Sequence, residues 1–192
     1  MGLDIRPLTR KTFDDLASLF GQGGDPKTCW CMYWRLRNKD WSLTAPGGNR
    51  ARMEAIADAD PPAGLLGYSE NEAVGWVSLG PREDFDRLEH SRVRPRLDDE
   101  PVWSIVCFVV SRKARKQGLA RELLDGAIDF ARDRGAPAVE AYPVDTAGGQ
   151  VPAANLYTGS ISMFRDAGFR VVHEVESPTA TVRRVIVRRK LR

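Results

Sequence analysis

The sequence contains few of the residues on which metal binding and disulfide bonding depend. It has three cysteines and two histidines among 192 residues. Three cysteines cannot all pair with one another, and Cys29 and Cys31 with the isolated His90 and His173 do not form a set of zinc ligands. We therefore expect reduced thiols, Cys107 included, and no bound metal.

Long hydrophobic runs are lacking as well. The longest apolar stretch without a charge, residues 101–110, is well short of the ~18–20 residues that cross a bilayer. The N-terminal segment MGLDIRPLTRKTFDDL carries charges throughout, whereas a secretory signal has a continuous apolar segment. We expect a cytoplasmic protein that does not bind a membrane.

Neither sign of charge dominates the chain. It has 29 Lys+Arg and 26 Asp+Glu, a net charge of +3, which suits a small polyanion as well as a nucleic acid. The C-terminal RRVIVRRKLR alternates like an edge strand with solvent-exposed arginines, so we expect no nucleic-acid partner. With 42% hydrophobic residues the chain can bury one sizeable core, and we expect a single domain over residues 1–192.

The pattern of apolar residues predicts strands that alternate with helices. The run 102–110 is nearly all apolar and fits a central strand covered on both faces. The charged segment 82–100 is interpreted as a mobile, partly helical surface. The other strands are expected at 3–8, 65–68, 73–79, 138–144, 171–175 and 182–187, and the helices after Thr9 or Thr12 and at 49–57, 118–134 and 160–167. This order predicts an α/β fold with a partly parallel sheet.

The most informative segment is a basic turn between the central strand and the helix after it. A helix N-terminus gathers free N–H groups and about half a positive charge. Gly118 lets the backbone approach an anion closely, and the small Ala120 keeps the first turn uncrowded. The basic side chains of the turn are Arg112, Lys113, Arg115 and Lys116. The turn therefore predicts a phosphate or pyrophosphate site, and neither the Walker nor the dinucleotide glycine pattern is present.

The spacing Arg115-x-x-Gly118-x-Ala120 after an apolar strand resembles the acyl-CoA pyrophosphate loop, Arg/Gln-x-x-Gly-x-Gly/Ala, of the GNAT superfamily of N-acetyltransferases. Gly168-Phe169 resembles the pair that ends a later helix of that superfamily, and Cys29-Trp30-Cys31 resembles a motif in a subset of its members. The resemblance implies a mixed sheet of about seven strands flanked by helices. It also implies an enzyme that transfers an acetyl group from acetyl-CoA directly to a primary amine within a ternary complex.

The resemblance assigns the cofactor contacts mainly to the backbone. It implies that the amides of Arg115, Lys116, Gln117, Gly118, Leu119 and Ala120 bind the pyrophosphate of CoA. Phe108, Val109 and Val110 would pair with the pantetheine arm as with an added strand, and Asn155 would also contact the cofactor. A strand amide there would polarise the thioester carbonyl.

The general acid and the general base of the reaction follow less directly from the sequence. Many GNAT relatives use a tyrosine of the later helix as the general acid, and this chain has Phe164 at that position. Tyr157 is therefore the first candidate for the acid, and Tyr142 the second. Glu140, acting through water, is the first candidate for the base, and Asp145 the second.

An aromatic segment, residues 27–41, lies where the superfamily builds the wall of its acceptor site. Trp30, Tyr33 and Trp34 are candidates for contacting an ammonium group by cation–π interaction, and core packing is the alternative for each. We expect a small-molecule amine or a peptide as the acceptor, and the resemblance allows a homodimer. The alternative function is a non-catalytic acyl-CoA-binding module of the same fold, which Phe164 favours.

Overall fold

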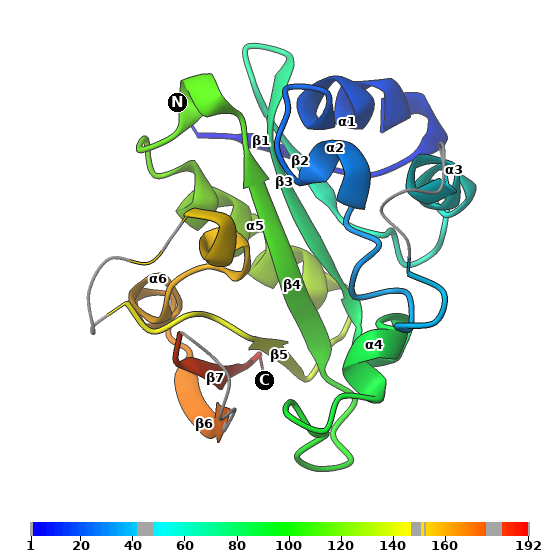
Figure 1. Ribbon diagram of the computed structural model, residues 1–192. Helices are drawn as coiled ribbons and strands as arrows, with labels where there is room; N and C mark the ends of the chain where they lie inside the picture. The colour runs from blue at the N-terminus through cyan, green and yellow to red at the C-terminus, as the bar shows by residue number, and fades with distance from the viewer. Residues whose placement is uncertain (1, 42–47, 147–150, 152, 176–181, 192) are drawn as a thin grey trace.

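The computed structural model describes residues 2–41, 48–146, 151, 153–175 and 182–191. A seven-stranded sheet in the order β1-β2-β3-β4-β5-β7-β6 runs through the molecule (Figure 1). The strands are β1 (Asp4–Pro7), β2 (Leu65–Ser69), β3 (Glu72–Pro81), β4 (Trp103–Val110), β5 (Ala138–Ala141), β6 (Arg170–Val175) and β7 (Arg184–Lys190). Only β4 and β5 pair in parallel, so the predicted mixed α/β sheet of about seven strands is confirmed.

Helices cover both faces of the sheet (Figure 1). They are α1 (Phe13–Phe20), α2 (Pro26–Cys29), α3 (Gly48–Ala55), α4 (Asp86–Glu89), α5 (Leu119–Asp133) and α6 (Ile161–Asp166). Four 3-10 helices join them: η1 (Arg10–Thr12), η2 (Arg82–Asp84), η3 (Arg112–Ala114) and η4 (Ala153–Thr158). Thr9 and Thr12 form a capping box ahead of α1, which satisfies donors at the start of that helical segment.

Each face of the sheet has its own hydrophobic core. The four buried positions of α1 pack with Trp30, Trp34 and Trp76 on one face. On the other face, the apolar stripe of α5 packs on β3, β4 and β5 together with α6. Because β4 contributes residues to both cores, it is the buried central strand that its apolar run predicted.

β4 has a bulge in its middle, and its C-terminal half does not pair with β5. Ser78 of β3 lies opposite Cys107 and Leu79 lies opposite Ile105, so Val106 is the extra residue of a bulge. On the other side, the pairing with β5 ends at Ile105 and Ala141, although β4 continues for five more residues. The two strands then diverge (Figure 1), and the C-terminal half of β4 borders an opening in the sheet.

Two surface predictions from the sequence are wrong. The segment 82–100, expected to be mobile surface, contains the fully buried Phe85 and Leu88 and a guanidinium, that of Arg82, which is 1% exposed. β7, expected at a sheet edge with solvent-exposed arginines, lies between β5 and β6, and the side chain of Arg188 is only 10% exposed. In both cases acidic side chains distant in sequence compensate the buried charge. No helix among the described residues is long and apolar enough to span a membrane.

Candidate active site

The turn between β4 and α5 presents free backbone donors to solvent. Gly118 caps α5 with a φ of 82°, and nothing lies within 4 Å of the position that a Cβ would take there. Within the described residues, the backbone N–H groups of residues 115–120 donate no hydrogen bond. The side chains of Arg112, Lys113, Arg115 and Lys116 are exposed around them. Free donors, the dipole of a 15-residue helix and four cations together fit a pyrophosphate group.

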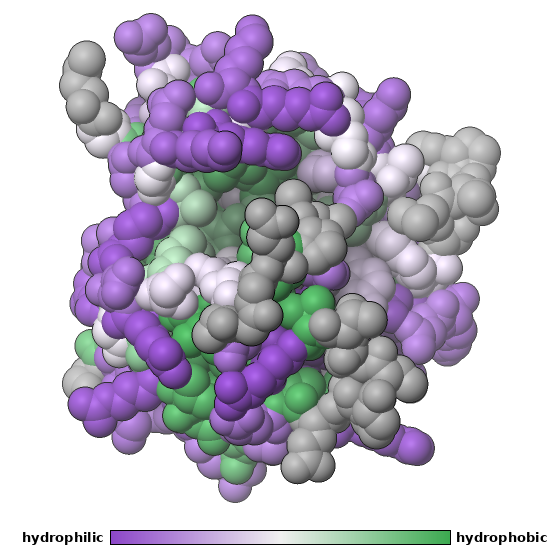
Figure 2. All heavy atoms as spheres, turned by 60° about the vertical axis from the view of Figure 1, so that its left-hand side comes forward, coloured by the Kyte–Doolittle hydropathy of each residue, from purple (hydrophilic) through white to green (hydrophobic). Residues whose placement is uncertain are grey.

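The free edge of β4 continues from this turn into the opening. Residues 106–110 have no strand partner on the side that faces away from β3 within the described chain. Phe108 is 8% exposed, and Val109 and Val110 are half-buried. Figure 2 shows apolar surface in a hollow between bands of hydrophilic side chains on this side of the molecule. An extended ligand with amide groups could bond to this edge as an added strand.

Tyr157 of η4 packs over the bulged part of β4. It contacts the same core as Val106 and Cys107 and is half-buried. The pKa of Tyr157 is raised to about 12, mainly because the phenol is buried; the charge of Arg184 opposes this rise, and the thiol of Cys107 adds to it. Its phenol is therefore protonated at neutral pH beside the opening. Asn155, two residues before it, is half-buried on the same element.

Phe164, which occupies the position of the usual acid, is part of the core. It is fully buried, and its ring centroid lies 6.2 Å from that of Phe108 and 5.0 Å from that of Phe169. The side chain has no proton to donate and fills space between β4 and α6. Its location agrees with a packing role at this position.

Glu140 and Tyr142 lie in a buried polar network around Arg82. Glu140 is 1% exposed, and its carboxylate accepts hydrogen bonds from Arg82 Nη1 at 3.3 Å and from Arg188 Nη2 at 2.7 Å. Arg82 Nη1 also donates to the phenol oxygen of Tyr142 at 2.9 Å, and Ser104 Oγ lies 2.9 Å from the same oxygen. Burial raises the pKa of Tyr142. Two guanidinium partners thus enclose the carboxylate of Glu140, the first candidate for the base.

Asp145, the second candidate for the base, lies just after β5. Its carboxylate accepts a hydrogen bond from Arg183 Nη1 at 2.9 Å, and its side chain is 16% exposed. The structure thus gives both carboxylate candidates arginine partners.

The Cys29-Trp30-Cys31 motif forms a turn that contacts β4. Trp30 and Cys31 have φ values of 50° and 51°, the left-handed region that residues other than glycine rarely adopt. The ring of Trp30 lies 5.9 Å from that of Phe13, and Cys31 Sγ lies 3.3 Å from Cys107 Sγ. The hydrogen bond to Cys107 and burial raise the pKa of Cys31. The turn therefore places a protonated thiol against the β4 bulge, and Trp30 packs with α1.

The other two aromatic candidates lie nearer the opening. The rings of Tyr33 and Trp34 meet edge to face with centroids 5.1 Å apart, and Trp34 stacks on Tyr142 at 6.4 Å. Tyr33 is half-buried and Trp34 is buried. Tyr33 also affects the pKa of Tyr157, which places the two phenols within electrostatic range. All four aromatic side chains contact one hydrophobic core, in which Trp30 packs with α1 and Tyr33 packs with Trp34.

Sequence reasoning missed two arginines beside Trp34 and Tyr157, in addition to Arg87, whose guanidinium carbon lies 4.1 Å from the ring centroid of Tyr33. The guanidinium carbon of Arg94 lies 5.1 Å from the centroid of Trp34. Arg184, the first residue of β7, donates through Nη1 to Thr158 Oγ1 at 3.2 Å, next to Tyr157. Neither belongs to a motif, because one lies in a charged segment and the other among six C-terminal arginines and lysines.

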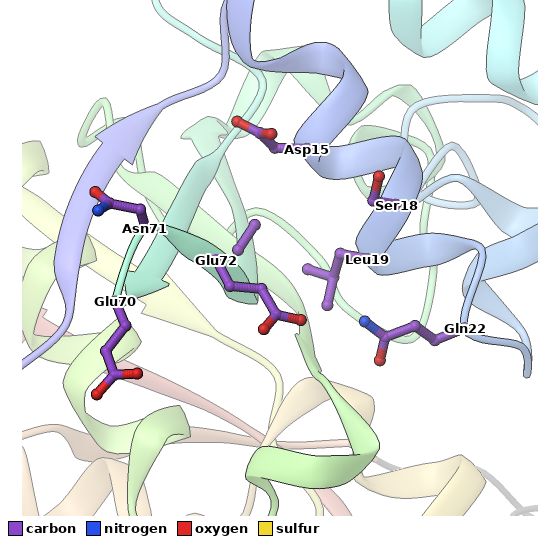
Figure 3. A pocket seen from close by; sticks show the side chains of 8 residues that line it. Asp15, Ser18, Leu19, Gln22, Glu70, Asn71 and Glu72 are labelled. Atoms are coloured by element: carbon purple, nitrogen blue, oxygen red, sulfur yellow. The ribbon is translucent and has the colours of Figure 1, made fainter.

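A separate pocket lies between α1 and the turn that joins β2 to β3 (Figure 3). Its volume is about 310 Å³, and it is lined by Asp15, Ser18, Leu19, Gln22, Glu70, Asn71, Glu72 and Ala73. It shares no residue with the basic turn or with the surroundings of Tyr157. Its acidic lining is unsuited to a polyanion.

Comparisons with known proteins agree with this architecture. The model of the acetyltransferase (GNAT) family matches residues 30–160. No curated protein matches the chain by sequence.

Similar solved structures include a ribosomal-protein-alanine N-acetyltransferase from Brucella melitensis, with 22% identity, coverage of 98% of this chain and 99% of that chain, and a TM-score of 0.58. A histone acetyltransferase HPA2 and related acetyltransferase from Corynebacterium glutamicum has 16% identity, coverage of 99% and 97%, and a TM-score of 0.60. The yncA protein of Salmonella typhimurium, solved with acetyl-CoA, has 16% identity, coverage of 100% and 95%, and a TM-score of 0.56. At these identities the structures establish the fold, and the family model covers more than half of the sequence. The chain therefore belongs to the GNAT family of acetyltransferases.

Proposed function

We propose that this protein is an acetyl-CoA-dependent N-acetyltransferase that transfers the acetyl group directly to a primary amine within a ternary complex. GNAT enzymes use an acyl-CoA donor and an amine acceptor, and one structure of the same fold contains acetyl-CoA. The observation that carries the proposal is the opening beside β4, where a free strand edge faces the protonated phenol of Tyr157.

The donor side of the opening would bind the cofactor through the main chain. The N–H groups of residues 115–120 would hold the pyrophosphate, and the free edge from Phe108 to Val110 would bond to the pantetheine arm, with Asn155 nearby. Acetyl-CoA would supply the activated acyl group. The N–H groups of the bulged strand are the donors available to polarise a carbonyl in this opening.

The proton of Tyr157 is the one available to a leaving group. Because its pKa is raised to about 12, Oη keeps its proton throughout the neutral range. Tyr142 is fully buried within the Arg82 network, which favours Tyr157 over Tyr142 as the acid.

No side-chain base is assigned to the reaction. Glu140 is enclosed by Arg82 and Arg188, and Asp145 is bound to Arg183. We propose instead that the acceptor amine reacts in its neutral form after losing its proton to water, with Glu140 and Tyr142 positioning the strands around the opening.

The buried Phe164 supports a second candidate, a module that binds acyl-CoA without turnover. The experiment that separates the two incubates the protein with acetyl-CoA and a broad panel of primary amines, and measures free CoA thiol and acetylated product. We expect CoA release only with an amine present, and intersecting initial-rate plots for the two substrates. Binding of acetyl-CoA without turnover on any amine would favour the module. Acetylated enzyme in the absence of an amine would contradict direct transfer.

A further inference from the structure

The acceptor side of the opening contains Arg94, whose charge no carboxylate compensates within the part of the chain that the structure describes. The Nε of Arg94 is buried and has no hydrogen-bond partner among the described residues. Burial lowers the pKa of Arg94 most; the other groups that affect it are Arg184, Tyr157, Tyr33 and Tyr142, and none of them is a carboxylate. A guanidinium partly removed from water without a partner is costly, and such groups normally pair with an anion.

Two other arginines of the same region have carboxylate partners. Arg82 binds Glu89 and Glu140, and Arg188 binds Asp98, Glu100 and Glu140. Among the described residues, Arg94 and Arg87 have no carboxylate partner and Arg35 has one, Asp84 at 3.9 Å, whereas Arg82 and Arg188 each have two or more.

The position of Arg94 is fixed independently of its side chain. Its carbonyl oxygen accepts a hydrogen bond from Arg82 Nη2 at 2.7 Å, which ties the loop to the core. Its guanidinium lies over the ring of Trp34, which in turn stacks on Tyr142. Because both the backbone and the guanidinium of Arg94 are held in place, the side chain loses little further conformational freedom when it binds a ligand.

A second guanidinium, that of Arg184, lies near Tyr157. Arg184 begins β7 and is oriented by its hydrogen bond to Thr158, the residue after Tyr157. The charges of Arg94 and Arg184 both act on the phenol of Tyr157, and they act on each other. Two like charges that both act on the candidate acid make its surroundings positive, which suits one anion.

We propose that Arg94 and Arg184 bind a carboxylate of the acceptor, which makes the substrate class of this enzyme amino acids, small molecules that carry a primary amine and a carboxylate. The inference rests on the proposed N-acetyltransferase function. The planar guanidinium binds a carboxylate through two parallel hydrogen bonds, and the aromatic side chains of Tyr33 and Trp34 enclose the site. Binding of the carboxylate there would bring the amine of the same molecule to the opening beside Tyr157.

The first test compares amino acids with their amides as acceptors, because the amide keeps the amine and removes the charge. We expect wild-type protein to have a kcat/KM about 10- to 100-fold higher for the acid than for the amide, the effect of one charge-assisted contact. Arg94→Gln should remove this preference by raising KM for the acid, while the dissociation constant of acetyl-CoA stays the same. Arg94→Lys should restore part of it, and Arg92→Gln, an exposed residue of the same loop, should leave it intact. Equal use of acid and amide by the wild type would overturn the proposal.

A binding measurement separates this proposal from the proposed function. Calorimetry with the same amino acids in the presence of CoA reports the carboxylate site without any chemistry. If amino acids bind, and Arg94→Gln or Arg184→Gln abolishes binding, the carboxylate site is established even when no acetylation is found. If no amino acid binds while amines without a carboxylate are acetylated, the carboxylate site is wrong and the acetyltransferase function stands.

Discussion

The two sides of the opening beside β4 are built from different parts of the chain. On the donor side the ligand would meet backbone N–H groups, those of residues 115–120 and of the free strand edge. On the acceptor side it would meet side chains that come from separate segments, namely Tyr33, Trp34, Arg94, Tyr157 and Arg184. A main-chain site depends on local conformation, whereas a side-chain site depends on each residue. The donor side can therefore be the same in chains that share the fold, whereas the acceptor side depends on the residues of each chain.

Replacing the phenol of Tyr157 should have the largest effect. Tyr157→Phe removes the protonated hydroxyl beside the bulge, and we expect kcat to fall by about 10²- to 10⁴-fold, the usual contribution of a general acid. Acetyl-CoA affinity should not change, because the donor side uses the main chain. Steady-state rates and calorimetry together check this, with Tyr68→Phe, which removes a phenol bound to Asp15, as the control. A kcat within twofold of wild type would eliminate Tyr157 as the acid.

Glu140 should affect stability rather than catalysis. Glu140→Gln removes one partner of a buried ion-pair network, and we expect the free energy of unfolding to fall by about 3–5 kcal/mol. The kcat per folded molecule should stay close to that of wild type, because this carboxylate is 1% exposed and faces Arg82 and Arg188. Denaturant unfolding and rates measured well below the melting temperature test both parts. A large loss of kcat with normal stability would restore Glu140 as the base.

Gly118→Glu should weaken the donor side selectively. The added carboxylate would extend from a position with no neighbour within 4 Å into the basic turn, and we expect the dissociation constant of acetyl-CoA to rise about 100-fold, the loss of roughly two charge-assisted contacts. Gly135→Glu is the matched control, because Gly135 is exposed, ends the same helix and has a similar φ of 76°. An unchanged affinity in a folded Gly118→Glu protein would refute this placement of the pyrophosphate.

The pH dependence should show the smallest effect. With no side-chain base, kcat/KM for the acceptor should rise with pH as the free amine loses its proton. No decline is expected below about pH 10, because burial raises the pKa of Tyr157 to about 12. The neutral phenol therefore stabilises the fold below the unfolded tyrosine pKa of ~10, and this contribution is lost as pH rises through about 12. A decline of kcat near pH 8, seen in wild type and absent in Tyr157→Phe, would contradict this.

The conformation of the basic turn can be predicted from the sequence more readily than the surroundings of Tyr157, for a physical reason. A helix start with a left-handed glycine and neighbouring basic residues is encoded within a few positions, so Gly118 and its turn can be recognised locally. The roles of Glu140 and Arg94 depend on partners far away in sequence. Glu140 is enclosed by Arg82, 58 residues before it, and by Arg188, 48 residues after it.

The same distinction explains the two errors in the fold. The charged segment containing Arg82 and the arginine-rich strand β7 both have compositions typical of surface. Each is internal because its charges meet acidic groups brought close by the sheet, which no local pattern reveals. By contrast, the apolar period of α5 and the apolar run of β4 predicted their places in the fold, because burial depends there on the residues themselves.

The hydrogen bond from Arg82 to the carbonyl of Arg94 has a consequence for how specificity can change. Because the core holds the main chain of residue 94, the loop does not depend on which side chain it carries. An acidic residue at this position would face Trp34 in place of a cation and would suit acceptors with a second ammonium group. A single substitution at position 94 would therefore change the proposed acceptor from an amino acid to a diamine, while the fold and the proposed donor site stay the same.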